Sequence, residues 1–263
     1  MRAAALTAAA MWQNFRERLP CLFDPGSEKL PPAPSLMHAM VAITAMVDGM
    51  GILAIPIMLA VSNEGIWAAQ AAAYGFAALL VWLFTSEFLA GRGVTSQQIW
   101  SWPAGDQSPG LALVDRLRAM RSRHVEAGIA AGLGVTLGAL AVGYRWCLWQ
   151  IPSVAEELAP MARYLAEHPQ SKWGLLLVSV GFAPMAEEYL FRGLLFRALD
   201  REWGGWRALI GSALFFGVYH PPMSWLPVGL MGLVLALVFK ASGRLWPCVI
   251  VHAVYNAIVV LTM

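Results

Sequence analysis

The chain has 263 residues, of which 59% are hydrophobic and 13% are charged, and its mean hydropathy is +0.59. Soluble domains carry about 25% charged residues, so this composition excludes an ordinary soluble protein and indicates a membrane protein. The net charge of +2 gives no argument for nucleic-acid binding. The three cysteines form no Cys-x-x-Cys pair, which excludes a disulfide framework and a thiolate zinc site.

The predicted fold is all-α: a polytopic membrane helix bundle with about seven transmembrane helices and short interfacial helices. A helix needs about 20 mainly apolar residues to cross the hydrocarbon core. Tryptophans fall mostly at the ends of the apolar runs, as they do in interfacial belts. The predicted spans are residues 36–61, 66–89, 125–149, 173–199, 206–220, 225–239 and 245–261.

The chain divides into three predicted regions. Residues 1–35 are expected to form a cytoplasmic or interfacial segment with a short amphipathic helix, because no clean cleavage site follows their alanine-rich start. Residues 36–150 hold the N-terminal transmembrane helices and a cytoplasmic loop, 91–123, in which residues 111–121 are expected to be helical. Residues 151–263 form the third region, a C-terminal core that holds the last four predicted spans.

Two local patterns predict helix ends and helix contacts. Ser153 and Glu156 have the spacing of a capping box, which predicts a short interfacial helix over residues 153–167. The third span carries small-x-x-x-small pairs, which let helices approach closely. The glycines of these pairs are Gly128, Gly132, Gly134 and Gly138.

The distribution of basic residues predicts the orientation. Most of the 18 Lys and Arg residues fall in the N-terminal segment and in the connections after spans two, four and six. By the positive-inside rule, the N-terminus is then cytoplasmic and the C-terminus lies outside.

The fourth span contains ionisable residues that an apolar helix does not need. Glu187 and Glu188 are adjacent, and Arg192 follows four residues after Glu188, so these two share a helix face and can pair. Glu187 lies about 100° further round the helix and does not share that partner. Because ionised groups in hydrocarbon are costly, they indicate a functional site.

Further polar residues lie in the last third of the chain. Phe216 and His220 are four residues apart in the fifth span, and His252 and Asn256 are four apart in the seventh. Counted at 1.5 Å per residue from one face, these groups and Glu187 fall at a similar depth. A carboxylate, two imidazoles and an amide at one level are consistent with a hydrolytic site, a metal site or a proton relay.

These three motifs together resemble those of the CPBP family of intramembrane proteases, which includes CAAX prenyl proteases and proteins of bacteriocin processing and immunity. The resemblance covers about residues 170–260 and rests on Glu-Glu-x-x-x-Arg, Phe-x-x-x-His and His-x-x-x-Asn in this order. It implies hydrolysis of a peptide bond within the membrane.

The resemblance also implies a role for each site residue. Glu187 and His220 activate a water molecule, and His252 and Asn256 stabilise the tetrahedral oxyanion. Glu188, paired with Arg192, holds the helix and orients its neighbour. The tyrosines Tyr189 and Tyr255 are assigned to packing.

The cofactor requirement stays open from the sequence. Glu187, His220 and His252 are one possible zinc-binding set, with two histidines and one carboxylate. The chain lacks His-Glu-x-x-His, and each of these residues also has a metal-free role, so a metal-independent glutamate mechanism is favoured.

Two other functions are compatible with these residues. Buried Glu and His side chains, with Asp48 in the first span, suit a proton-coupled transporter, although no inverted repeat is present. A non-proteolytic immunity or scaffold member of the family is the other alternative. The expected partners are a membrane protein or peptide substrate and the lipid bilayer, without nucleic acid, and the expected location is the bacterial cytoplasmic membrane.

Overall fold

The computed structural model describes residues 35–60, 66–91, 93–101 and 123–263. All secondary-structure elements assigned within these ranges are helices, so the predicted all-α fold is confirmed. The surface helix predicted within residues 1–35 and the helix predicted over 111–121 fall outside the described part of the chain.

The helices follow the predicted spans closely. Four helical stretches of the described residues are long and apolar enough to cross a membrane: 72–90, 125–149, 171–202 and 222–242. Three shorter apolar helices cover the other predicted spans, at Leu36–Gly49, Gly205–Val218 and Leu245–Leu261. The chain is therefore a membrane helix bundle. Its elements are α2 (Leu36–Ala60), α3 (Ile66–Ala90), α4 (Ser96–Trp100), α6 (Arg123–Trp149), α7 (Pro152–Glu167), α8 (Ser171–Leu176), η2 (Leu177–Phe182), α9 (Ala183–Glu188), η3 (Tyr189–Phe196), α10 (Arg197–Glu202), α11 (Gly205–Val218), η4 (Pro222–Ser224), α12 (Trp225–Ser242) and α13 (Leu245–Leu261).

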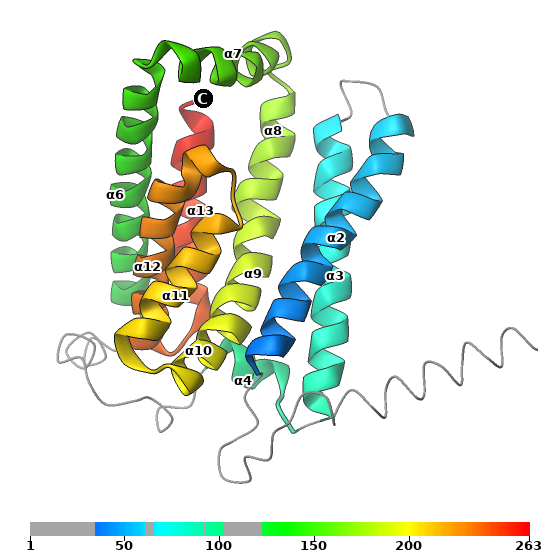
Figure 1. Cartoon of the computed structure of the whole chain (residues 1–263), viewed down its shortest axis with the longest axis vertical. Coiled ribbons are helices and arrows are strands. Elements are labelled where there is room, and N and C mark those ends of the chain that lie inside the picture. Colours follow the sequence, from blue (N-terminus) through cyan, green and yellow to red (C-terminus); the bar gives the residue numbers. More distant parts are fainter. Residues whose placement is uncertain (1–34, 61–65, 92, 102–122) are drawn as a thin grey trace, which may run out of the picture.

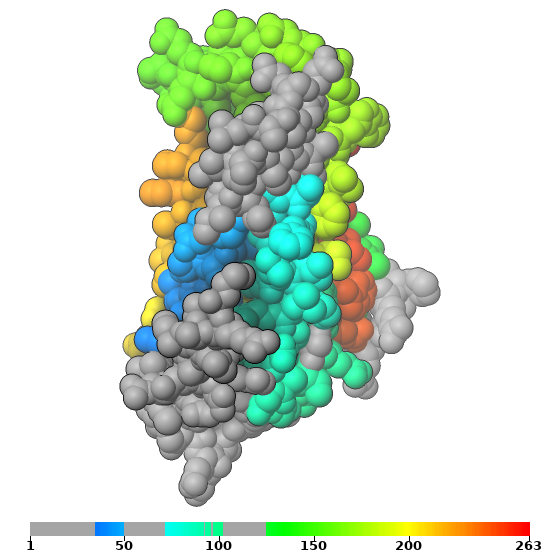
Figure 2. All heavy atoms as spheres, turned by 90° about the vertical axis from the view of Figure 1, so that its right-hand side faces the viewer, coloured from blue at the N-terminus to red at the C-terminus, as the bar shows by residue number. Residues whose placement is uncertain are grey.

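The elements form two groups (Figure 1). The first holds the helical run α8 to α10 together with α6, α11, α12 and α13, and α7 lies across one end of it. The second is the pair α2 and α3, which lie side by side on one face of the molecule (Figure 2). This pair packs against the run α8 to α10 through contacts of α2 with η3 and of α3 with α8, η2 and α9.

The run from α8 to α10 is one continuous helical stretch, interrupted twice by π-helical turns. The segments η2 and η3 lie directly before and after α9, which carries Glu187 and Glu188. A π turn shifts the backbone hydrogen-bond pattern, and such turns are frequent at functional sites. The two acidic residues thus lie on a short α-helical section between two widened turns.

The glycines of α6 differ in what they contact. A Cβ atom at Gly134 would lie 2.7 Å from the carbonyl oxygen of Val251, and one at Gly138 would lie 2.9 Å from Cβ of Ile258. At Gly128 and Gly132 an added Cβ would meet nothing within 4 Å. The close approach predicted from this stripe is therefore made by one face only, where α6 packs on α13.

The helix predicted over residues 153–167 is present as α7, but its predicted cap is wrong. The helix begins at Pro152, its N-cap is Ile151, and no side chain caps it. Proline favours the first helical position because it has no N–H group to satisfy, which moves the start ahead of Ser153. The described residues do contain a capping box elsewhere, in which Thr95 and Gln98 begin α4.

Buried charges fix the end of the run α8 to α10. Asp200 accepts a hydrogen bond from Lys240 of α12 at 2.8 Å, and both side chains are about 5% exposed. The guanidinium of Arg197 donates to the carbonyl oxygens of Gln98 and Ile99, which ties α4 to this end. Arg197 and Lys240, at the ends of the fourth and sixth predicted spans, are among the basic residues assigned to the cytoplasmic side, and the structure buries both in the protein.

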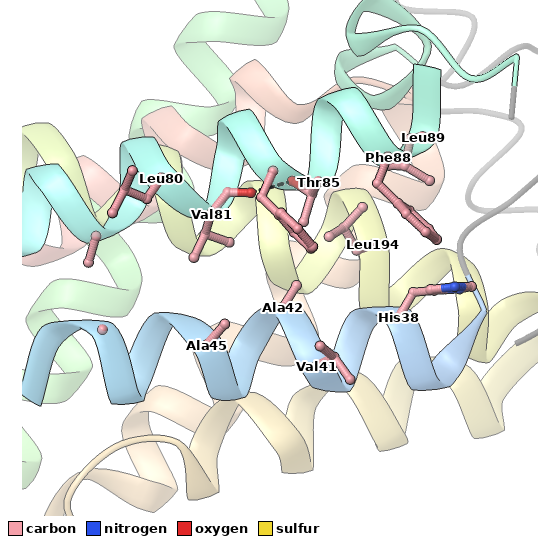
Figure 3. A pocket seen from close by; sticks show the side chains of 13 residues that line it. His38, Val41, Ala42, Ala45, Leu80, Val81, Thr85, Phe88, Leu89 and Leu194 are labelled. Carbon is pink, nitrogen blue, oxygen red and sulfur yellow. Dashed lines mark hydrogen bonds between the residues drawn. The ribbon is translucent and has the colours of Figure 1, made fainter. Parts of the chain in front are cut away.

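An apolar cavity of about 250 Å³ separates parts of α2 and α3 (Figure 3). Its walls come from both helices, with Leu194 of η3 between them. Thr85 and His38 supply its few polar atoms. The hydroxyl of Thr85 donates to the carbonyl oxygen of Val81 at 2.6 Å, so it is already engaged. The α2–α3 side therefore presents a mainly apolar interior.

Candidate active site

Glu187 is the residue at which helices from both groups meet. Its side chain is 7% exposed, and its two carboxylate oxygens have different surroundings. Oε1 accepts a hydrogen bond of 2.8 Å from the hydroxyl of Tyr74 on α3. Oε2 lies 3.7 Å from Nε2 of His220 and 3.9 Å from Nε2 of His252. Oε2 is buried and has no hydrogen-bond partner among the described residues, although buried polar atoms usually have one.

His220 is positioned by the end of α11 and by the turn that follows. Its Nδ1 lies 2.9 Å from the carbonyl oxygen of Phe216. A carbonyl oxygen can only accept, so the ring proton is assigned to Nδ1 and Nε2 is left as an acceptor facing Glu187. Pro221 stops the helix, and the indole N–H of Trp225 donates to the His220 carbonyl at 2.7 Å, which fixes the turn.

Glu188 forms a second, separate network. The residue is fully buried, and its Oε1 accepts hydrogen bonds from Arg192 at 3.1 Å and from Nδ1 of His252 at 2.8 Å. The i, i+4 pair predicted from the spacing is confirmed. Its link to His252 was not predicted from the sequence. Because Nδ1–H of His252 donates to the Glu188 carboxylate, the Nε2 atom of this ring points toward Glu187. Nε2 is an acceptor when the ring is neutral and a donor when the ring carries a second proton.

Arg192 has contacts beyond its pair with Glu188. The guanidinium donates to the carbonyl oxygen of Gly232 on α12 at 3.0 Å, and its centre lies 4.2 Å from the ring centroid of Phe216. A buried cation over an aromatic face gains electrostatic stabilisation from the ring. Arg192 therefore links the run α8 to α10 to both α11 and α12, in addition to balancing the charge of Glu188.

Asn256 lies beside this cluster rather than within it. It follows His252 by one turn of α13, a distance of about 6 Å along the helix axis. Its Nδ2 donates to the carbonyl oxygen of Ser179, in the π-helical segment η2, at 2.6 Å. An amide nitrogen carries two hydrogens, so this bond uses one and leaves the second.

The described structure thus brings together Glu187, Glu188, Arg192, His220 and His252, and it places Asn256 one turn away. Three other ionisable residues of the described chain lie elsewhere. Asp48 is exposed on α2, and His38 and His168 bond to their own helix ends, to Ser35 and Tyr164 respectively.

Tyr74 is the site residue that sequence reasoning missed. It is the only tyrosine of the second span and lies among small residues, with Ala71 to Ala73 before it and Gly75 after it. A tyrosine in a stripe of small residues is a signal for close helix contact, and it was available in the sequence. Tyr189, assigned to packing, shares a hydrogen bond of 2.8 Å with Thr85 of α3. Both tyrosines therefore join α3 to the run α8 to α10, which carries Glu187 and Glu188 and is called the acidic run or acidic helix from here on.

The possible zinc-binding set can be compared with the geometry that zinc requires. With bonds of about 2.0–2.1 Å, a tetrahedral zinc ion keeps its donor atoms about 3.4 Å apart. Oε2 of Glu187 is 3.7 and 3.9 Å from the two Nε2 atoms. Among the described residues, no group of three or more His, Cys, Asp or Glu side chains is arranged to hold a metal ion. Glu187 Oε2 therefore lies farther from both nitrogens than the donor atoms of a tetrahedral zinc site lie from one another, and this arrangement does not fit a zinc ion.

With this geometry established, the chain can be compared with known proteins. Residues 169–258 match the family model described as type II CAAX prenyl endopeptidase Rce1-like. The resemblance predicted from the three motifs is confirmed. The Rce1-like region contains all six predicted site residues, whereas Tyr74 lies outside it.

A curated relative supports this result. An 88-residue stretch is 28% identical to "Putative membrane peptidase YdiL" of Bacillus subtilis (strain 168). The match covers 33% of this chain and 36% of the length of that relative. The comparison with solved structures found no match.

Proposed function

We propose that the chain is an intramembrane endopeptidase that hydrolyses a peptide bond of a membrane-associated protein or peptide, as a CAAX-type protease does. The main support is the convergence of Glu187 Oε2 with Nε2 of His220 and Nε2 of His252, at 3.7 and 3.9 Å. Glu187 Oε2 and His220 Nε2 are both acceptors, and they meet in a mainly buried position. Two such acceptors call for a proton donor between them, and a water molecule is the reactant that hydrolysis requires.

In the proposed reaction, Glu187 acts as the general base. Its Oε2 takes a proton from the water molecule while the water oxygen attacks the carbonyl carbon of the peptide bond. The same proton then passes to the leaving amine nitrogen, which regenerates the carboxylate. His220 accepts the second hydrogen bond of the water through Nε2, because its own ring proton is held by the Phe216 carbonyl.

The oxyanion of the tetrahedral intermediate needs donors. His252 serves as an imidazolium: Glu188, 2.8 Å from Nδ1, stabilises the positive ring, and Nε2–H then faces the oxyanion. Asn256 contributes the amide hydrogen that the Ser179 bond leaves over. Glu188 is therefore a positioning residue with two partners, Arg192 and His252, rather than only a helix-stabilising charge.

The proposal includes a location and partners. The expected location is a bacterial cytoplasmic membrane, with the N-terminus in the cytoplasm and the C-terminus outside, because most Lys and Arg residues lie in the connections assigned to the cytoplasm. The partners are the lipid bilayer and a membrane protein or peptide substrate, without nucleic acid. A reporter fused to the C-terminus tests the orientation: activity of a periplasmic reporter supports it, and activity of a cytoplasmic reporter contradicts it.

A proton-coupled transporter is the second candidate, favoured by the burial of Glu187 and His252. Purified protein in liposomes separates the two functions, with a quenched fluorogenic membrane peptide as one readout and a lumenal pH dye as the other. The protease proposal expects peptide cleavage by the wild type and none by Glu187→Gln. Equal cleavage by both proteins would contradict it, and proton flux that depends on Glu187 without cleavage would support the transporter. Absence of both activities would favour the scaffold member.

A further inference from the structure

The two oxygens of the Glu187 carboxylate have separate environments, and a residue outside the Rce1-like region makes the difference. Tyr74 of α3 donates its hydroxyl hydrogen to Oε1 at 2.8 Å, whereas Oε2 faces the two imidazoles. The carboxylate oxygens are acceptors, so the phenol is the donor in this bond. Nothing in the three motifs specifies a tyrosine on α3.

We propose that Tyr74 is a positioning residue that holds the Glu187 carboxylate so that Oε2, and not Oε1, faces the water and the imidazoles. This proposal rests on the general-base role of Glu187. The terminal torsion of a glutamate side chain is broad and roughly two-fold, so packing alone leaves the carboxylate plane poorly defined. A single donor on one oxygen fixes that plane.

The role requires that the hydroxyl reach Glu187 accurately, and the local packing provides this. The ring lies on α3 next to Gly75, where an added Cβ would be 3.9 Å from the ring of Phe182. Phe182 ends η2 immediately before α9, so α3 beside Tyr74 is in ordinary van der Waals contact with the residue that precedes the helix of Glu187. This contact holds the Tyr74 hydroxyl within reach of the carboxylate.

The chain offers a matched control for this hydrogen bond. Tyr189 and Thr85 share a bond of the same length, 2.8 Å, between the same two helical segments of the fold. That bond does not involve Glu187. Tyr74→Phe and Tyr189→Phe therefore each remove one hydroxyl that joins α3 to the acidic run, but only Tyr74→Phe changes the surroundings of the base.

The test measures steady-state cleavage of a fluorogenic membrane peptide by purified full-length protein in liposomes. The variants are Tyr74→Phe, Tyr189→Phe, Glu187→Gln and the double variant of positions 74 and 187. In Tyr74→Phe the Glu187 carboxylate loses the donor that holds its orientation, so we expect kcat to fall by about 10²-fold while KM stays nearly unchanged. Tyr189→Phe should retain kcat within about threefold, because a lost neutral hydrogen bond outside the site has a small effect. The double variant should be no slower than Glu187→Gln, because Tyr74 acts only through Glu187.

A second measurement tests whether the hydroxyl, rather than a change in the packing of the ring, accounts for the loss of kcat. Incorporation of 3-fluorotyrosine at position 74 keeps the hydroxyl and should keep kcat close to the wild-type value. The proposal is overturned if Tyr74→Phe has the kcat of the wild type. It is also overturned if Tyr74→Phe and Tyr189→Phe lose the same share of kcat, or if the loss in Tyr74→Phe accompanies a lower melting temperature. If Glu187→Gln cleaves as fast as wild type, the protease function itself fails; if only Tyr74→Phe is normal, the role of Tyr74 alone fails.

Discussion

The Rce1-like region and the α2–α3 pair, which packs against the run α8 to α10 of that region, contribute different chemistry. The first places Glu188, Arg192 and His252 at 0–1% exposure in one connected network. The second presents an apolar cavity (Figure 3) and large exposed apolar side chains. It reaches the run α8 to α10 through the hydrogen bonds of Tyr74 to Glu187 and of Thr85 to Tyr189. The polar cluster therefore lies in one part of the chain, whereas a hydrogen bond to its Glu187 carboxylate comes from another.

Breaking the buried network should give the largest effect after loss of Glu187 itself. Glu188→Gln removes the charge that balances Arg192 and that would stabilise the proposed His252 imidazolium. We expect kcat to fall by about 10²–10⁴-fold, as for other carboxylate–histidine pairs. Loss of one partner of a buried pair also costs about 3–5 kcal/mol, so folded yield should fall as well. Turnover and thermal unfolding in detergent measure both effects.

The matched variant is Arg192→Ala, which should lower folded yield and activity for the same reason. If both variants fold normally and turn over like wild type, the structural role of this network is wrong.

Asn256 tests the oxyanion part of the site. Asn256→Ala removes both the amide donor and the bond to Ser179. We expect kcat to fall by about 10²–10³-fold, the usual loss for one oxyanion donor. Asn256→Gln, which keeps the amide on a longer side chain, serves as the comparison. Retention of wild-type kcat by Asn256→Ala would remove this residue from the mechanism.

The interface of α6 and α13 tests how far the site depends on packing around it. Gly134→Ala places a methyl group 2.7 Å from the Val251 carbonyl, next to His252. Such overpacking costs about 1–3 kcal/mol, so the melting temperature should fall. Gly132→Ala is the matched control on the same helix, because an added Cβ there meets nothing within 4 Å. Equal melting temperatures for the two variants would contradict the observed packing.

Metal removal should have the smallest effect. Chelators are expected to leave the activity of the purified protein intact, because the proposed activation of water by Glu187 and His220 needs no metal ion. The Nδ1 atoms of His220 and His252 are anchored as they are in many metal-bound histidines, which makes the experiment informative. Loss of activity on chelation and its recovery with zinc would establish a metalloprotease instead.

Much of the fold was predictable because membrane spans appear in a sequence as long apolar runs. Predicted and observed helix ends agree within a few residues for the spans at 36–61, 66–89 and 245–261. The π turns η2 and η3 were not predictable, since a shifted hydrogen-bond pattern has no marker in the apolar sequence. The predicted start of α7 at Ser153 was wrong because Pro152 takes the first helical position, so the helix begins one residue earlier and without a side-chain cap.

The site was predictable where spacing along one helix decides the contact. The Glu188–Arg192 pair follows from an interval of four residues. The Glu188–His252 bond and the Tyr74–Glu187 bond join residues 64 and 113 positions apart. These bonds depend on how α13 and α3 are rotated against the acidic helix, which no local pattern specifies. Asp48, prominent in the sequence, is exposed on α2 and joins no part of the cluster.

The most direct test of the account measures oxygen incorporation during a single turnover. Purified wild type and Glu187→Gln, matched for melting temperature, are mixed in liposomes with a membrane peptide in water enriched in oxygen-18. The account predicts a cleaved peptide whose new carboxyl group carries one heavy oxygen with wild type, and no cleavage with Glu187→Gln. Labelled product formed equally fast by Glu187→Gln would contradict it.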